Sequence, residues 1–229
     1  MMLLEIIATC VDDAITAEQN GADRLELITA ITEGGLTPGI GLVEEVVKAV
    51  QIPVHVMVRP HSRSFVYSTH DIATMTAEVK AIRKAGAAGV VLGMLTPDGK
   101  IDEVSLANML EWTGSMQVTF HRAFDELEDQ FEGLRTLLKY PSVTRVLTSG
   151  GPQPAPQAIP RIRELVEQTK GSELKILAGN GLKWEIIREF IDQTGVSEVH
   201  FGSAVRYGRS GLKPIDPIEL RSLADSIHQ

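Results

Sequence analysis

The sequence is poor in the features that mark secreted, membrane and nucleic-acid-binding proteins. Its 229 residues contain one cysteine, Cys10. One cysteine cannot form an internal disulfide, so we expect a reducing compartment and a cytoplasmic location. No apolar run is long enough to cross a bilayer, and the apolar start at 1–8 is interrupted by Glu5 and has no basic leader, so we expect neither a signal peptide nor a membrane span. Lysine and arginine total 22 against 30 aspartates and glutamates, a balance that argues against nucleic acid as a partner.

What the sequence does have is a regular alternation of short apolar runs with segments of helical period. Ile72, Met75 and Val79, for example, recur at the spacing of one helix face. The strand-length runs are Leu3–Ala8, Arg24–Ile28, Val54–Arg59, Gly89–Leu92, Gln117–His121, Arg145–Thr148, Lys175–Ala178 and Glu198–Phe201. This spacing predicts an α/β protein with one domain over 1–229, a (β/α)8 TIM barrel that ends in a short C-terminal helix. An open doubly wound sheet is the alternative, but the glycine-rich turn of a dinucleotide-binding protein is absent after the first run.

Several predicted strands carry a polar face, although parallel strands covered on both sides are usually apolar throughout. Side chains alternate along a strand, so apolar faces against the helices leave the polar faces inside the barrel. The inward set is Glu5, Glu26, Arg59, His121 and His200. Their position toward the strand C-termini is typical of barrel active sites. The alternative is a structural network, with an ion pair between Glu26 and Arg59 and a hydrogen-bonded His200, and we expect Glu198 and His55 to lie near the lower rim.

Glycine-containing loops follow the sixth, seventh and eighth predicted strands. Their candidate anion-binding residues are Ser149, Gly150, Gly179, Asn180, Gly181, Gly202 and Ser203. Backbone N–H groups of such loops often form a phosphate cradle in this fold, so the pattern predicts an anion site, with ordinary turn formation as the alternative. The Gly34–Gly39 loop, after the second strand, is either a lid over the barrel mouth or a tight turn.

Six sequence motifs together resemble the CutC family. They are GADRLEL at 21–27, EGGLTP at 33–38, VMVRP at 56–60, FHRAFD at 120–125, VLTSGG at 146–151 and EVH at 198–200. The resemblance runs from about Leu3 to Phe201 and implies a cytoplasmic TIM barrel with a role in copper homeostasis. Relatives often carry cysteine where this chain has Ile28, and Arg-Gly-Gly-Asp-Phe where it has His61–Phe65. The first departure weakens the case for copper binding, and the second changes the loop after the third strand.

The first functional hypothesis is a copper-handling protein. Copper(I) prefers cysteine and methionine sulfur and accepts histidine. The available ligands are Cys10 after the first strand and the inward-facing Met57 and His121. A three-ligand copper site would need these to meet, and no metal-ligand spacing in the sequence supports it.

The second hypothesis is an enzyme that acts on a small phosphorylated or otherwise anionic metabolite. Glu26 would be the general base, His121 the acid or second base, and Arg59 with Arg122 the clamp for an anion and an oxyanion. Asp125 would orient Arg122 or bind hydroxyl groups. This set favours proton transfer next to a carbonyl, as in an isomerase, epimerase or lyase. A third hypothesis is a ligand-binding barrel without catalysis, and in each case we expect a homo-oligomer.

Overall fold

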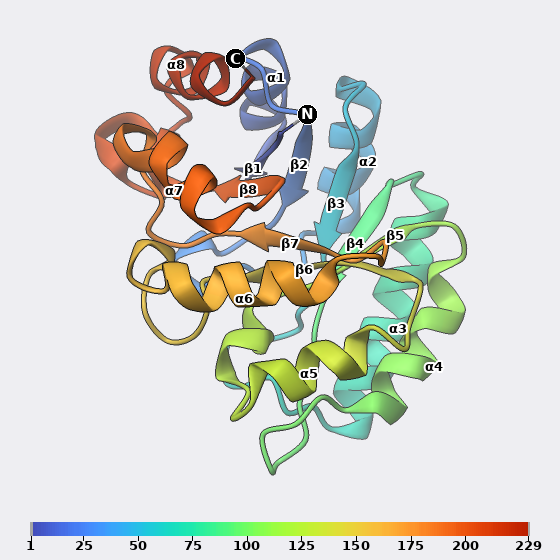
Figure 1. Cartoon of the computed structure of the whole chain (residues 1–229). Coiled ribbons are helices and arrows are strands. Elements are labelled where there is room, and N and C mark those ends of the chain that lie inside the picture. The colour runs from blue at the N-terminus through green and yellow to red at the C-terminus, as the bar shows by residue number, and fades with distance from the viewer. Residues whose placement is uncertain (1, 229) are drawn as a thin grey trace.

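The computed structural model describes residues 2–228, and its strands and helices alternate along the whole chain (Figure 1). The strands are β1 (Leu3–Ala8), β2 (Arg24–Leu27), β3 (Val54–Met57), β4 (Gly89–Leu92), β5 (Gln117–Phe120), β6 (Val143–Thr148), β7 (Lys175–Ala178) and β8 (Glu198–Phe201). The helices are α1 (Val11–Gln19), α2 (Ile40–Ala49), α3 (Thr69–Lys84), α4 (Glu103–Thr113), α5 (Gln130–Leu137), α6 (Ile159–Thr169), α7 (Ile187–Thr194) and α8 (Pro217–His228).

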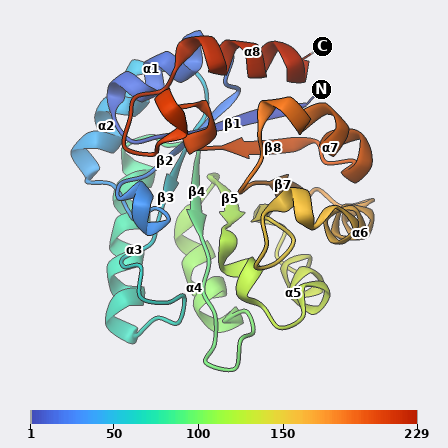
Figure 2. The same cartoon turned by 90° about the vertical axis from the view of Figure 1, so that its left-hand side faces the viewer.

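The strands form a closed parallel barrel in the order β1 to β8, with β8 pairing back to β1. Figure 2 shows the helices surrounding the strands on all sides. The predicted (β/α)8 barrel and its C-terminal helix are therefore confirmed. Four boundaries differ: β2, β3 and β5 end one or two residues before their predicted ends, and β6 begins at Val143, two residues before its predicted start. It pairs with β5 through a register shift between Val118 and Thr119, so the pairing is irregular at the point where β6 begins.

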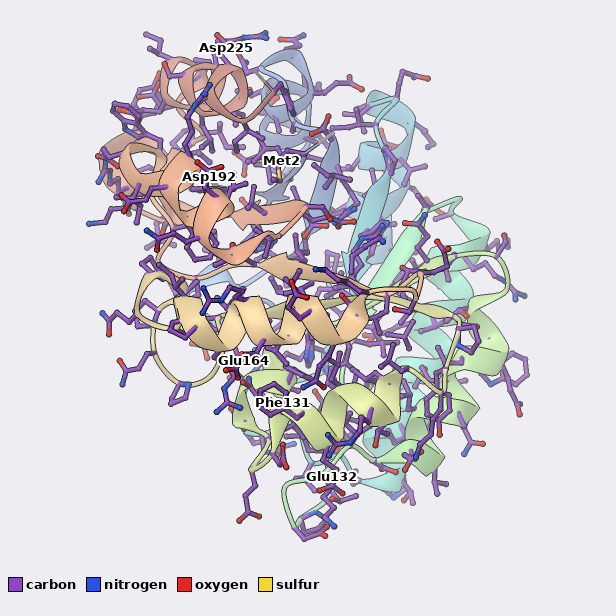
Figure 3. The ribbon with its side chains drawn as sticks, viewed as in Figure 1. Met2, Phe131, Glu132, Glu164, Asp192 and Asp225 are labelled. Carbon is purple, nitrogen blue, oxygen red and sulfur yellow. The ribbon has the colours of Figure 1, made fainter. Side chains whose placement is uncertain are left out.

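Local sequence signals explain where the helices begin and what they bury. Ser68 precedes α3, and its hydroxyl accepts a hydrogen bond from Asp71 N while the Asp71 side chain accepts one from Ser68 N. Such a capping box satisfies N–H groups that the first turn leaves without partners. The outer helix faces carry charge, as Glu132, Glu164 and Asp192 illustrate in Figure 3.

The apolar faces of the strands pack under these helices and form the main hydrophobic core. The inner faces carry buried polar and charged side chains, which makes the barrel interior the unusual part of this molecule. Within residues 2–228, no helix combines the length and the apolar character that crossing a bilayer would require.

Candidate functional site in the barrel mouth

The lower part of the barrel interior is a closed network of ion pairs. Arg24 Nε donates to Glu5 at 2.5 Å and Arg24 Nη2 donates to Glu198 at 2.7 Å. Arg145 Nε also reaches Glu198 at 2.7 Å, and its Nη1 donates to Gln117 at 2.7 Å. Two carboxylates thus face two guanidinium groups, and the charges cancel inside the barrel. The expected structural position of Glu198 is confirmed, and this layer serves the fold.

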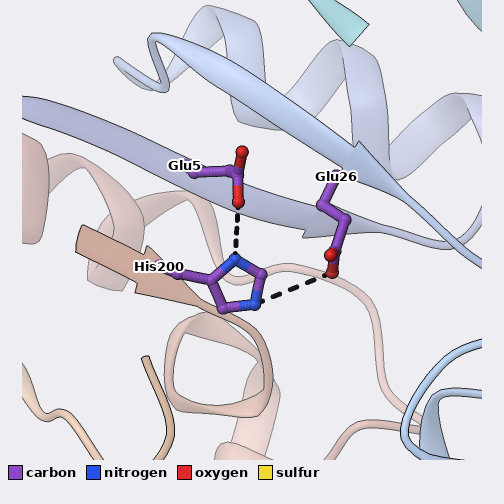
Figure 4. A group of neighbouring side chains, drawn as sticks. All are labelled: Glu5, Glu26 and His200. Atoms are coloured by element: carbon purple, nitrogen blue, oxygen red, sulfur yellow. Dashed lines mark hydrogen bonds and ion pairs between the residues drawn. The ribbon is translucent and has the colours of Figure 1, made fainter. Parts of the chain in front are cut away.

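One layer nearer the mouth, the imidazole of His200 lies between two carboxylates (Figure 4). His200 Nδ1 is 2.8 Å from Glu5 Oε1, and Nε2 is 3.7 Å from Glu26 Oε2. Burial raises the pKa of Glu26 to about 7, against the opposing effect of His200. Burial alone would lower the pKa of His200, but the charges of Glu26 and Glu5 offset it and raise that pKa. Glu26 therefore changes protonation near neutral pH.

The Glu26–Arg59 ion pair of the structural alternative is not formed. Glu26 lies beside His200, while Arg59 Nη1 donates to the carbonyl oxygens of Glu33 at 2.9 Å and Gly35 at 3.2 Å. The physical reason is position along the strands: Arg59 follows the end of β3 and belongs to the barrel mouth, and the loop after β2 folds over it. Arg59 is 7 % exposed, and its Nε–H has no hydrogen-bond partner in the described part of the chain.

His121 presents an N–H group from the end of β5. Its Nδ1 accepts a hydrogen bond from Ala123 N at 3.2 Å, so the proton of the neutral ring sits on Nε2. Burial, followed by the charge of Arg59, lowers the pKa of His121 to about 3, so the ring stays neutral at pH 7. Nε2 has no partner among residues 2–228. Of the two predicted roles, acid and second base, this tautomer fits the acid, or a neutral hydrogen-bond donor.

Asp125 is enclosed by the loop that follows β6. Its carboxylate accepts hydrogen bonds from the Thr148 hydroxyl, from Ser149 N and Oγ at 3.1 and 3.0 Å, and from Gly151 N at 3.3 Å. Arg122 Nε donates to the same group at 2.8 Å, so Asp125 orients Arg122, one of its two predicted roles. The loop after β6 already holds an internal anion, which leaves it no free cradle for a ligand.

Above these groups a cavity of about 850 Å³ opens at the barrel mouth, a volume typical of small-molecule sites. Its wall includes Glu26, Arg59, His121, Arg122, Asp125 and His200 from the predicted inward and catalytic sets, and Asn180, Gly181, Gly202 and Ser203 from the predicted anion loops. The other three loop residues, Ser149, Gly150 and Gly179, do not line it. Ser149 is bonded to Asp125, and the backbones of Gly150 and Gly179 pack against Ala158 and Leu147. The predicted anion-binding residues that line the cavity therefore all belong to the loops after β7 and β8.

The three predicted copper ligands do not meet. Met57 and His121 line the mouth cavity. Cys10 lies in a separate hollow, where its Sγ caps α1 and accepts a hydrogen bond from Asp13 N at 3.4 Å. His121 turns a protonated nitrogen inward, which cannot ligate a metal without losing its proton. Met57 is the one sulfur ligand in the described cavity wall, and Nε2 of His200 faces the Glu26 carboxylate, so the residues of the cavity do not fit a copper site.

In the described chain, one group of side chains does have the spacing of metal ligands. Atoms of Glu5, Glu26 and His200 lie within 4.8 Å of one another. The two oxygens of Glu5, however, already accept hydrogen bonds from Arg24 and His200. We therefore assign this group to the ion-pair network of the interior.

Sequence reasoning missed Phe65, from the loop after β3. The Arg59 guanidinium lies 4.6 Å above the centre of its ring, and the ring of His121 lies 4.8 Å away. Phe65 thus packs against both groups. The available signal was an aromatic residue, rare in this chain, close after the Arg59 of the predicted site.

Fold and cavity together define a TIM-barrel protein with a cavity lined by polar side chains at its C-terminal mouth. The chain belongs to the CutC family, whose model matches residues 2–205. It is 39 % identical to the human "Copper homeostasis protein cutC homolog" over 92 % of this chain and 76 % of that protein. It is 40 % identical to the CutC family protein of Citrobacter koseri, over 93 % of this chain and 86 % of the relative. A crystal structure of CutC from Streptococcus agalactiae superposes with a TM-score of 0.83 at 28 % identity, over 87 % of this chain and 98 % of that one.

Proposed function

We propose that this chain serves copper homeostasis, the role in the name of its human relative, and that it does so by binding a small organic anion in the mouth cavity. A built copper site is not part of the proposal, because Met57 is the one sulfur ligand among the described residues of the cavity wall. The single cysteine supports a cytosolic location. A homo-oligomer is a further part of the proposal, and sedimentation equilibrium tests it.

The observation that carries the anion proposal is the isolation of Arg59. Among the described residues, the other three buried arginines pair with carboxylates: Arg24 with Glu5 and Glu198, Arg145 with Glu198, and Arg206 with Asp13. Arg59 has no carboxylate within ion-pair distance among residues 2–228 and keeps an unpartnered N–H beside an open cavity. A buried cation without a negatively charged partner is costly in free energy, and an anionic ligand would remove that cost.

Complementation tests this proposal. Cells that lack this chain, grown in toxic copper, receive the wild type, Arg59→Met or Cys10→Ser. We expect the wild type and Cys10→Ser to restore growth and Arg59→Met to fail, with equal protein levels by immunoblot. Rescue by Arg59→Met together with failure of Cys10→Ser would overturn the anion site in favour of copper binding at the thiol.

A second candidate function is proton transfer next to a carbonyl, and the unpartnered Glu26 Oε1 favours it. Glu26 would take the proton from the carbon beside the carbonyl, and the C–H electron pair would move to the carbonyl oxygen. His121 N–H and Arg59 would hold the resulting enolate oxygen. Return of the proton to the other face of the same carbon gives an epimer. Where that carbon carries a hydroxyl group, transfer of the hydroxyl proton to the enolate oxygen and return of the carbon proton to the former carbonyl carbon give an isomer.

Solvent exchange tests this reaction without knowledge of the substrate. A panel of 2-oxo acids, 2-hydroxy ketones and sugar phosphates is incubated in D2O and followed by proton NMR. We expect loss of one C–H signal with the wild type and at least a 100-fold slower loss with Glu26→Gln. Equal exchange by both proteins would remove Glu26 as the base.

A further inference from the structure

The barrel interior has a charge balance that depends on one proton. Glu5 and Glu198 cancel Arg24 and Arg145 through bonds of 2.5 to 2.7 Å. All four side chains are buried, and the net charge of this layer is zero. The charge nearer the mouth therefore depends on the next layer, where Glu26 and His200 are the ionisable pair.

Geometry couples Glu26 and His200. Glu5 Oε1 lies 2.8 Å from His200 Nδ1, which fixes a proton on Nδ1 and turns Nε2 toward Glu26. The 3.7 Å between Nε2 and Glu26 Oε2 is an ion-pair distance but too long for a good hydrogen bond. One proton beyond that on Nδ1 makes the pair neutral, either as carboxylate with imidazolium or as carboxylic acid with imidazole.

The groups that face this pair come from several strands. Glu5 and Arg24 lie on β1 and β2 below it, and on the mouth side Arg59 and His121 line the same cavity as Glu26. His121 is neutral, so of these two residues Arg59 is the one that carries positive charge. An anion that neutralises Arg59 brings negative charge into the cavity that Glu26 also lines, and negative charge in a shared cavity favours a proton on the carboxylate.

We propose that Glu26 and His200 carry one shared proton when the cavity is empty and that a second proton enters, on Glu26, when a carboxylate or phosphate anion binds beside Arg59. Binding is thereby proton-coupled: the incoming proton comes from solvent and bonds to the Glu26 carboxylate. His200 is a positioning residue here, because it acts on the anion through Glu26. The inference rests on the proposed anion site.

Calorimetry measures this proton directly. Oxalate, 2-phosphoglycolate and inorganic phosphate are titrated into the protein at pH 7.5 in PIPES, HEPES and Tris, whose ionisation enthalpies differ. We expect the wild type to take up between half a proton and one proton per bound anion. Glu26→Gln binds with little uptake. Glu164→Gln, which removes an exposed carboxylate from α6 outside the cavity, keeps wild-type uptake.

His200→Asn separates coupling from simple support of the fold. Without the imidazole, the interior is neutral only when Glu26 is already protonated, so we expect binding with uptake near zero. A purely structural His200 would weaken binding and leave the uptake per bound anion unchanged, which would overturn its part in the coupling. Circular dichroism confirms folding of each variant.

A second measurement separates failure of this inference from failure of the anion site. Carboxyl-13C glutamate labelling, with Glu26→Gln to assign the signal, follows the Glu26 carboxyl by NMR from pH 5 to 9 in the empty protein. We expect the Glu26 carboxyl signal to titrate near neutral pH in the wild type. We expect the midpoint of this titration to shift in His200→Asn. A carboxyl that titrates at ordinary acid pH, together with a His200 ring that stays neutral in histidine 15N spectra over the same pH range, overturns the shared proton, even where anions bind. Absence of binding by all three anions overturns both the uptake and the proposed function.

Discussion

At the scale of single residues, glycines make room for the inward-facing imidazoles. A Cβ on Gly89 would lie 2.6 Å from the ring of His55, and one on Gly93 would lie 2.5 Å from Nδ1 of His121. Both distances are far below van der Waals contact. Two of the imidazoles in the barrel therefore depend on a glycine in β4 or directly after it.

We expect Gly93→Ala to displace the ring of His121 and to break its hydrogen bond from Ala123 N. Anion affinity, measured by calorimetry with oxalate, should fall about 10-fold or more, because the N–H that faces the cavity loses its direction. Gly41→Ala is the control: it has open space around its Cβ and lies within α2, so it should leave affinity unchanged. Unchanged affinity in Gly93→Ala would show that His121 does not touch the anion.

At the scale of elements, the loop after β6 depends on the carboxylate from the loop after β5. Asp125 accepts bonds from the backbone or side chains of Thr148, Ser149 and Gly151. The two loops therefore form one unit at the mouth. This unit holds Arg122 in place through Asp125 and through Ser149 Oγ at 3.2 Å.

We expect Asp125→Asn to lower the free energy of unfolding by about 3 kcal/mol, because a buried amide group would face donors that the carboxylate now satisfies. Urea denaturation measures the change. Asp129→Asn is a matched control: Asp129 also accepts two backbone N–H bonds, but it is exposed at the start of α5, where asparagine caps equally well. Similar losses in both variants would contradict the special role of Asp125.

The elements were more predictable from sequence than the contacts at their ends. Alternating apolar runs predicted all eight strands, and the polar faces predicted that Glu26 and His121 point inward, because strand periodicity is a local property. The capture of Asp125 by the loop at 148–151 was not predictable, since it depends on where two separate loops meet. The His121 tautomer depends on one backbone N–H, that of Ala123. Cys10 lies outside the cavity because the helix that it caps begins there.

At the scale of the whole molecule, the buried interior ties stability to pH. The pKa of Glu26 is about 7 in the folded protein against an ordinary value of 4.5. A raised pKa means that the stability from this group is complete below about pH 4.5 and is lost as the pH rises through 7. Glu26→Gln removes that dependence. Between pH 5 and pH 8, the free energy of unfolding of this variant should rise relative to that of the wild type by on the order of 2–3 kcal/mol.

Denaturation at four pH values from 5 to 8 measures this difference. Glu33→Gln controls for the loss of one carboxylate, because Glu33 is exposed and should give a stability curve parallel to the wild type. If the curve of stability against pH for Glu26→Gln also ran parallel to that of the wild type, the buried carboxyl would have the same affinity for protons in the folded and unfolded chains.

The distribution of soft ligands over the whole molecule bears on copper itself. Cys10 and Met57 line different hollows, and the neutral His121 presents N–H to the cavity. We therefore expect equilibrium dialysis with copper(I), against a competing chelator at micromolar concentration, to leave no copper on the protein. Addition of oxalate should not change this result, because Arg59 binds the anion and not a metal.

Copper retained by the wild type and lost in Met57→Leu would contradict this expectation, since it would require the cavity to gather ligands that the folded chain keeps apart. Loss in Cys10→Ser alone would place the metal outside the barrel mouth and leave the anion site intact.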